Sequence, residues 1–133
     1  MGRILVIDDD ASVRDAMAFL LRMHGHDIFM AGEGHAGLAT LETTPVDLVI
    51  VDRHMPKMDG LEVIKSIRGK LPALPIIAMS GSIVDGDFVV PRALASGPGF
   101  GAIKTLPKPL RAETLLSLVD DILGVAGERE QHA

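Results

Sequence analysis

The sequence predicts an α/β fold in which a doubly wound parallel sheet carries helices on both faces. Five short apolar runs recur along the chain, and several are unbroken rather than alternating, as in strands that are covered on both faces. Segments with the apolar spacing of helices separate these runs, and such an alternation of strand and helix indicates a parallel sheet. The length of 133 residues suits one domain, and a hydrophobic content of 47% is enough for a full core.

The expected strands are short and stop where charged or turn-forming residues follow. The first stops before three consecutive aspartates, and the third runs directly into Asp52. In chain order the strands are RILVI at 3–7, DIFMA at 27–31, DLVIV at 47–51, PIIAM at 75–79 and AIKTL at 102–106.

The segments between the strands predict helices over 11–24, 34–42, 59–68 and 110–123, from the spacing of their apolar residues. Gly25 offers a C-terminal stop for the first of these helices. The expected buried positions are Val13, Met17, Leu20, Leu21 and His24 in the first helix, and Leu115, Leu118, Val119 and Ile122 in the last.

Residues 81–101 interrupt this regularity with several glycines and prolines. Proline is tolerated in the first turn of a helix but is costly in its interior, so Pro91 limits where a helix can begin. We expect a long loop, a short helix near 90–96 and a second loop. The expected domain spans residues 1–124, and residues 125–133 are expected to form a flexible tail.

The composition excludes several classes of function. The chain has no cysteine, which rules out disulfides, thiol catalysis and cysteine metal sites. A net charge of −5 disfavours direct binding to nucleic acid or to an anionic membrane. No apolar run approaches the roughly 20 residues that span a bilayer, and aspartates interrupt the N-terminal segment before a signal-peptide core forms. We therefore expect a soluble cytoplasmic protein.

Polar side chains follow the expected strands at their carboxyl ends, where ligands of open parallel sheets bind. Asp8, Asp9 and Asp10 follow the first strand, Asp52 ends the third, Ser80 follows the fourth and Lys108 follows the fifth. Each has a plain structural interpretation on its own, such as Asp10 capping the first helix or Ser80 starting a turn.

The combination favours phosphoryl chemistry. Several carboxylates at one edge of the sheet repel one another unless they are protonated or share a cation, and hard oxygen ligands suit Mg²⁺. Lys108 supplies a charge for an anion and Ser80 a hydrogen-bond donor. A magnesium ion, an ammonium and a hydroxyl around one carboxylate are the groups that phosphoryl transfer requires. A carboxylate can itself be the nucleophile in this reaction, and Asp52 at the end of a rigid strand is well placed for that role.

The chain resembles the receiver domain of bacterial two-component response regulators, the CheY-like family. The resemblance rests on ILVIDDD at 4–10, DLVIVDRHMPKMDG at 47–60, PIIAMSGS at 75–82 and LPKPL at 106–110, in the family's order, and it covers residues 3 to about 124. It implies a flavodoxin-like five-stranded parallel sheet with strand order 2-1-3-4-5.

The resemblance also implies the role of each site residue. Asp52 would be the phospho-acceptor, and Mg²⁺ would be held by Asp9 directly, by Asp8 through water, by Asp52 and by the backbone carbonyl of His54. Lys108 would bind a phosphoryl oxygen, and a cis Lys108–Pro109 bond would hold it toward the pocket. Ser80 would hydrogen-bond the phosphoryl group and move with it as part of the switch.

Three positions depart from the family pattern. Thr105, which we assign to the switch together with Ser80, stands where the family's fifth strand usually has an aromatic residue. The segment 81–101 is longer and richer in glycine and proline than usual, and we expect it to be mobile until phosphorylation or partner binding orders it. His54, together with Ser82, occupies a variable place beside the pocket, where it would tune how fast water attacks the acyl phosphate.

Two alternative functions have some support in the sequence. Residues 8–12, DDDAS, resemble the D-x-D motif of haloacid-dehalogenase-type phosphatases, in which Asp8 would be the nucleophile and Asp10 the general acid. Residues 32–37, GEGHAG, match a dinucleotide-binding fingerprint, although Glu33 stands where a pyrophosphate would pass.

The favoured interpretation is a receiver domain that takes phosphate from a phosphohistidine on a sensor histidine kinase or a histidine phosphotransfer protein. The transfer would be self-catalysed with Mg²⁺ and followed by slow autodephosphorylation, so the protein would not be a turnover enzyme. Phosphorylation would shift a conformational equilibrium that a downstream protein target reads. The chain would act as a single-domain regulator, or as a receiver module of a larger regulator or hybrid kinase; a non-phosphorylated binding module on the same fold is a weaker option.

Overall fold

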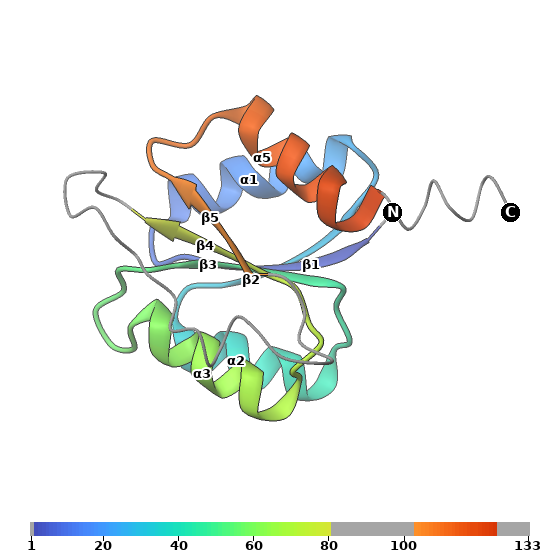
Figure 1. Cartoon of the computed structure of the whole chain (residues 1–133). Helices are drawn as coiled ribbons and strands as arrows, with labels where there is room; N and C mark the ends of the chain where they lie inside the picture. Colours follow the sequence, from blue (N-terminus) through green and yellow to red (C-terminus); the bar gives the residue numbers. More distant parts are fainter. Residues whose placement is uncertain (1, 81–102, 125–133) are drawn as a thin grey trace, which may run out of the picture.

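A computed structural model of the chain describes residues 2–80 and 103–124, and it has the predicted α/β architecture. Its elements are β1 (Arg3–Ile7), α1 (Ala11–Met23), β2 (Asp27–Ala31), α2 (Gly34–Thr43), β3 (Leu48–Asp52), α3 (Gly60–Lys70), β4 (Ile76–Ser80), β5 (Ile103–Pro107), α5 (Ala112–Val119) and the π-helical turn η1 (Asp120–Gly124). The strands form one parallel sheet in the order β2-β1-β3-β4-β5, which confirms the expected topology. Helices α1 and α5 cover one face, and α2 and α3 cover the other (Figure 1).

The unbroken apolar runs reflect a core on each side of the sheet. Alternate side chains of a strand point to opposite faces, so Ile4 and Val6 of β1 pack under α1 and α5. Leu5 and Ile7 pack on the other side, against residues of α3 such as Ile64. All four of these β1 side chains are fully buried, which is why β1 carries no polar residue between Arg3 and Asp8.

Most expected boundaries agree with the structure within a residue or two. The expected third, fourth and fifth strands each end one residue early, since β3 ends at Asp52 and the register pairs Ser80 at the end of β4 with Pro107 at the end of β5. The expected start of β5 at Ala102 lies outside the described residues. The expected last helix begins too early, since Arg111 is extended and precedes α5 as its N-cap. The expectations for 81–101 and for 125–133 fall outside the described residues.

One expected core residue is not in the core. His24 follows α1 as its C-cap, with non-helical backbone angles, and its side chain is exposed. The helix ends there because Gly25 adopts a positive φ of 88°, which confirms the predicted stop. His24 was wrongly placed by extending the helical spacing one residue past the last helical position.

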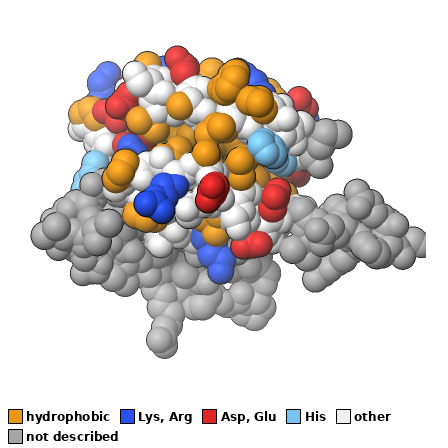
Figure 2. Space-filling model, turned by 90° about the horizontal axis from the view of Figure 1, so that it is seen from above, with side chains coloured by type: hydrophobic (Ala, Val, Ile, Leu, Met, Phe, Trp, Pro, Cys, Tyr) orange, Lys and Arg blue, Asp and Glu red, His pale blue; other side chains and the backbone are white. Residues whose placement is uncertain are grey.

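The outer surface of α1 leaves large apolar side chains exposed. Phe19 is 64% exposed and Met23 is 67% exposed, one turn apart on the same helix. Figure 2 looks down on the layer of α1 and α5 and shows hydrophobic side chains gathered there. Contiguous apolar surface of this kind is typical of contact with another macromolecule. Within the described residues, no helix is both long and apolar enough to span a bilayer.

His26 links the N-terminal end of β1 to the turn before β2. Its Nδ1 accepts a hydrogen bond from the backbone N–H of Gly2 at 3.0 Å, which requires the lone pair of the neutral ring. Burial lowers the pKa of His26 below its usual value of 6.5. Because the unfolded chain then binds more protons than the folded one, the free energy of unfolding falls as the pH drops through and below about 6.5.

Replacing His26 with Asn tests this link. Asn keeps an acceptor near Nδ1 but does not titrate, so we expect His26→Asn to lose less stability than the wild type between pH 7.5 and pH 5.5. Urea unfolding of both proteins at the two pH values measures the difference. An equal loss of stability in both proteins would show that His26 does not contribute to the pH dependence.

Candidate functional site

The predicted site residues lie at the carboxyl edge of the sheet. Asp8 follows β1 and Asp52 ends β3, and the two strands are neighbours with Ile7 paired to Val51, so the next residues of each strand come side by side. Carboxylate oxygens of Asp8, Asp9 and Asp52 all lie within 4.8 Å of one another. Asp8 and Asp52 are buried, at 0% and 4% exposure, whereas Asp9 is exposed.

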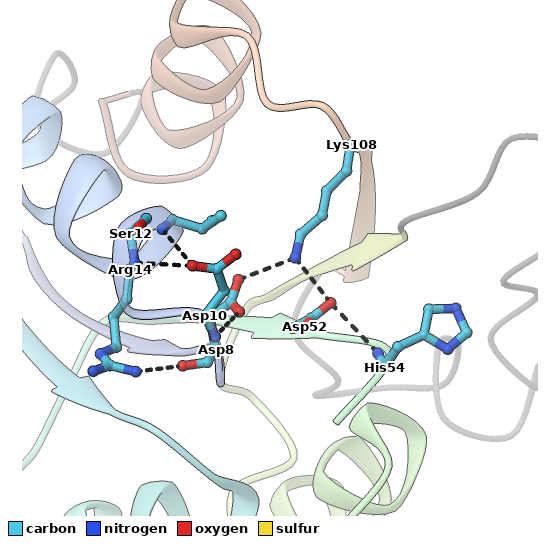
Figure 3. Close-up of polar contacts among 8 residues, drawn as sticks. Asp8, Asp10, Ser12, Arg14, Asp52, His54 and Lys108 are labelled. Atoms are coloured by element: carbon cyan, nitrogen blue, oxygen red, sulfur yellow. Dashed lines mark hydrogen bonds and ion pairs between the residues drawn. The ribbon is translucent and has the colours of Figure 1, made fainter. Parts of the chain in front are cut away.

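Lys108 reaches this cluster from the end of β5. Its Nζ lies 3.2 Å from Oδ2 of Asp8 and 3.3 Å from Oδ1 of Asp52, so one ammonium bridges two buried carboxylates (Figure 3). The Lys108–Pro109 bond is cis, as the resemblance implies. Burial alone would lower the pKa of Lys108, but Asp52 and Asp8 outweigh it and raise that pKa. The side chain is therefore a cation at neutral pH.

The site carries an excess of negative charge. Burial and the charge of Asp8 raise the pKa of Asp52 above its usual value of 3.8, against the opposing effect of Lys108. Two buried carboxylates and a third exposed one meet a single described ammonium, so the cluster is suited to a further cation. Oxygen ligands from one or two carboxylates, with room for water at the exposed Asp9, are the donor set that Mg²⁺ prefers.

Asp10 serves the backbone rather than the pocket. Its Oδ1 accepts hydrogen bonds from the N–H groups of Ser12 at 2.9 Å and Val13 at 3.3 Å, which makes it the N-cap of α1, as expected. Its own N–H donates to Oδ1 of Asp8 at 2.9 Å. A carboxylate engaged in capping is a poor general acid, and one oxygen of Asp8 is occupied by the N–H of Asp10. These contacts disfavour the phosphatase alternative.

The two ends of the loop between β3 and α3 are held together by contacts that the sequence did not predict. Arg53 forms an ion pair with Asp59, and the N–H of Gly60 donates to the carbonyl of Arg53 at 3.0 Å. Asp59 also caps α3 through the N–H of Leu61 at 3.0 Å. Burial alone would raise the pKa of Asp59, but the hydrogen bonds from Arg53 and Leu61 outweigh it and lower that pKa. The capping contact could have been predicted from the segment MDG, because an Asp directly before a helical run commonly serves as the N-cap of that helix.

His54 stands beside Asp52 but directs its ring away from it. The N–H of His54 lies 3.4 Å from Oδ1 of Asp52, while the imidazole is exposed (Figure 3). The backbone of His54 is therefore the part of this residue next to the carboxylates. The predicted role of its backbone carbonyl as a metal ligand stays a prediction.

The two predicted switch residues are on the strands at the far side of the sheet. Ser80 ends β4 and pairs with Pro107, but its side chain lies outside what the structure describes, as does Ser82. Thr105 is exposed on β5 and lines a cavity of about 360 Å³ with residues of α5, among them Glu113 and Ser117. Thr105 therefore faces α5 and solvent.

Two of the three glycines in residues 32–37, Gly34 and Gly37, have packing reasons. Gly34 starts α2, and a Cβ there would lie 2.8 Å from Val63. At Gly37, a Cβ would lie within 2.7 Å of Ile7, so the glycine lets α2 approach β1 closely. Glu33 pairs with Lys57 at 3.5 Å between Nζ and Oε2. These contacts account for the pattern without a dinucleotide.

Comparison with known proteins gives one consistent result. The family model described as "Response regulator receiver domain" matches residues 4–120. Response regulator MprA of Mycobacterium tuberculosis is 35% identical over 121 residues, covering 91% of this chain and 50% of its own. Sensory transduction protein RegX3 of Mycolicibacterium smegmatis is 31% identical over 123 residues, covering 92% of this chain and 51% of its own. The chain thus spans about half the length of the curated relatives it matches.

Two single-domain-sized solved structures share the fold over nearly their full length. The chemotaxis response regulator CheY4 of Vibrio cholerae has a TM-score of 0.81 at 28% identity, covering 92% of this chain and 99% of its own. The response regulator protein TrrA of Thermotoga maritima, solved in complex with Mg²⁺ and BeF, has a TM-score of 0.77 at 30% identity, covering 92% of this chain and 100% of its own.

Proposed function

This chain belongs to the response regulator receiver domain family, and on that premise we propose that Asp52 accepts a phosphoryl group from a phosphohistidine of a sensor histidine kinase or a histidine phosphotransfer protein. The observation that supports this most is the convergence on Asp52: a buried carboxylate at the tip of β3, one ammonium at 3.3 Å and two further carboxylates beside it.

The proposed transfer needs a nucleophile and compensation of negative charge. An oxygen of ionised Asp52 attacks phosphorus, the new O–P bond forms as the P–N bond to imidazole breaks, and the leaving imidazole takes up a proton. Lys108 binds a phosphoryl oxygen and compensates its charge. Asp8, Asp9, Asp52 and the carbonyl of His54 would hold Mg²⁺, which supplies a positive charge next to the phosphoryl oxygens. The chain's own residues thus carry out the transfer, followed by slow autodephosphorylation.

The acyl phosphate would then act as a switch. Ser80 would hydrogen-bond the phosphoryl group, and the shift would be read at Thr105 and along β5 and α5 by a downstream protein target. The exposed apolar side chains of α1 support contact with protein partners. Since curated relatives are about twice as long, we treat the chain as a receiver module whether it works alone or within a larger regulator. Its proposed location is the cytoplasm.

Mapping the phosphoryl group tests the proposal. The protein is incubated with Mg²⁺ and acetyl phosphate, a small phosphodonor, the acyl phosphate is reduced with borohydride, and the modified residue is located by mass spectrometry. We expect modification at Asp52. Modification at Asp8, or steady hydrolysis of a phosphate ester, would instead support the phosphatase alternative, and a protein that shows neither modification nor hydrolysis would refute both.

Metal dependence gives a second prediction, at Asp9. Its exposed carboxylate lies within 4.8 Å of the other two and has no capping role, so Asp9→Asn should raise the Mg²⁺ concentration for half-maximal labelling by about tenfold or more. Chelation with EDTA should stop labelling of the wild type. The rate of labelling as a function of Mg²⁺ concentration measures both effects.

The matched control is Asp10→Asn. Asn also caps helices well, so this variant removes the adjacent charge and retains the N-cap of α1. We expect a clearly smaller rise in the Mg²⁺ requirement than for Asp9→Asn. Equal effects of the two substitutions would mean that only the net charge of this segment matters, and that Asp9 is not a ligand.

A further inference from the structure

The backbone carbonyl of Asp8 has a side-chain donor. The N–H of Asp8 continues the β1–β2 pairing by donating to the carbonyl of Ala31 at 3.1 Å. In a parallel ladder the carbonyl of the same residue takes its donor from two positions further along the neighbouring strand. That position is Glu33, the N-cap of α2, where β2 has already ended. Nη1 of Arg14 donates to the Asp8 carbonyl at 2.7 Å.

The surroundings accommodate this contact. Arg14 lies in the first half of α1 and reaches back over the end of β2, where a Cβ on Gly32 would come within 3.3 Å of its Nη1. Arg14 and Lys108 approach Asp8 from opposite sides, the guanidinium at the backbone and the ammonium at the carboxylate (Figure 3). Asp8 is thereby held at its N–H, at its carbonyl and at both carboxylate oxygens.

We propose that Arg14 is a positioning residue for the divalent-ion site: by holding the Asp8 carbonyl, it fixes the backbone from which the carboxylates of Asp8 and Asp9 project. The inference rests on the proposed function. A hydrogen bond from a charged donor is about twice as strong as a neutral one, and it acts here one residue before a predicted direct ligand. Partners that orient metal ligands commonly change metal affinity by about 10- to 100-fold when they are removed.

An opposing electrostatic effect has to be considered. A guanidinium near a Mg²⁺ site repels the ion, so removing its charge would by itself tighten binding. Arg14 donates to a backbone carbonyl on the side of Asp8 away from Lys108, so its charge is not directed at the carboxylates that would hold the ion. We therefore expect the loss of positioning to outweigh the loss of repulsion.

The experiment compares Arg14→Ala with Arg22→Ala. Arg22 is on the same helix, and its Nη2 also donates to a backbone carbonyl, that of Ile28 at 3.2 Å, far from the carboxylates along the strand. Mg²⁺ affinity is measured by isothermal titration calorimetry on the unphosphorylated proteins at about 0.15 M ionic strength. Labelling by acetyl phosphate is measured over a range of Mg²⁺ concentrations, and urea unfolding reports the stability of each variant.

We expect Arg14→Ala to raise the Kd for Mg²⁺ about tenfold, with the labelling rate restored at saturating Mg²⁺, and Arg22→Ala to leave the Kd unchanged. Arg14→Lys, which keeps the charge and a donor, should fall between the wild type and Arg14→Ala. An unchanged or tighter Kd in Arg14→Ala, or an equal loss in Arg22→Ala, would overturn the inference. A wild type that binds Mg²⁺ but is never labelled would refute the proposed function and leave the role of Arg14 intact.

Discussion

Asp52→Asn is expected to abolish phosphoryl labelling while the fold persists. The substitution replaces the carboxylate oxygen that attacks phosphorus by an amide, at the buried tip of β3. A raised pKa means that the folded protein holds a proton on Asp52 more tightly than the unfolded chain does, so ionised Asp52 costs folding free energy at pH 7. The neutral Asn removes the repulsion from Asp8, and Lys108 retains Asp8 as its partner. We therefore expect a melting temperature no lower than that of the wild type.

The control for this prediction is Asp47→Asn, at the residue directly before the other end of β3. Oδ2 of Asp47 accepts a hydrogen bond from the N–H of Arg3 at 2.8 Å, and Asn can accept the same bond. Labelling with acetyl phosphate and Mg²⁺, together with thermal unfolding, is measured for the three proteins. Persistent labelling of Asp52→Asn would exclude Asp52 as the acceptor, and a collapse of its melting temperature would show that the ionised carboxylate is structural.

The sequence was sufficient to predict which chemical groups meet at the site. Asp8, Asp52 and Lys108 each follow a run of apolar residues, and parallel strands bring their carboxyl ends to one edge of the sheet. That reasoning needs only the order of the elements, and the structure brings these three side chains together with Asp9. The roles assigned to them remain predictions until labelling and metal binding are measured.

The contacts that fix these groups could not be predicted from the sequence. Nothing in the spacing indicates that Arg14 reaches the carbonyl of Asp8, or that Arg53 pairs with Asp59. A long side chain has several possible partners, and only the folded structure determines which of them is within reach. His24 shows the related limit at helix ends. Its position continues the apolar spacing, yet the helix stops one residue earlier where Gly25 turns the chain.

Gly60→Ala is expected to destabilise the scaffold of the site strongly, although it adds only one methyl group. Gly60 is the first residue of α3, and a Cβ there would lie 2.3 Å from the carbonyl oxygen of Asp52 and 2.8 Å from the Cα of Arg53. Both are backbone atoms, so no flexible side chain can move aside. Either α3 shifts away from β3 or the end of β3 is displaced. We expect a loss of about 3 kcal/mol in the free energy of unfolding, measured by urea denaturation.

In the same helix, replacing Gly69 with Ala is expected to increase the stability of the protein rather than decrease it. Gly69 is exposed in the last turn of α3, and a Cβ there would meet nothing within 4 Å. Gly69→Ala should therefore stabilise the protein by about 0.5 to 1 kcal/mol, from helix propensity and from the reduced freedom of the unfolded chain. Similar changes in stability for the two variants would contradict the close approach of α3 to β3.

Because the clash at Gly60 involves the backbone of Asp52 itself, Gly60→Ala should also weaken labelling under conditions where the variant is still folded, whereas Gly69→Ala should not.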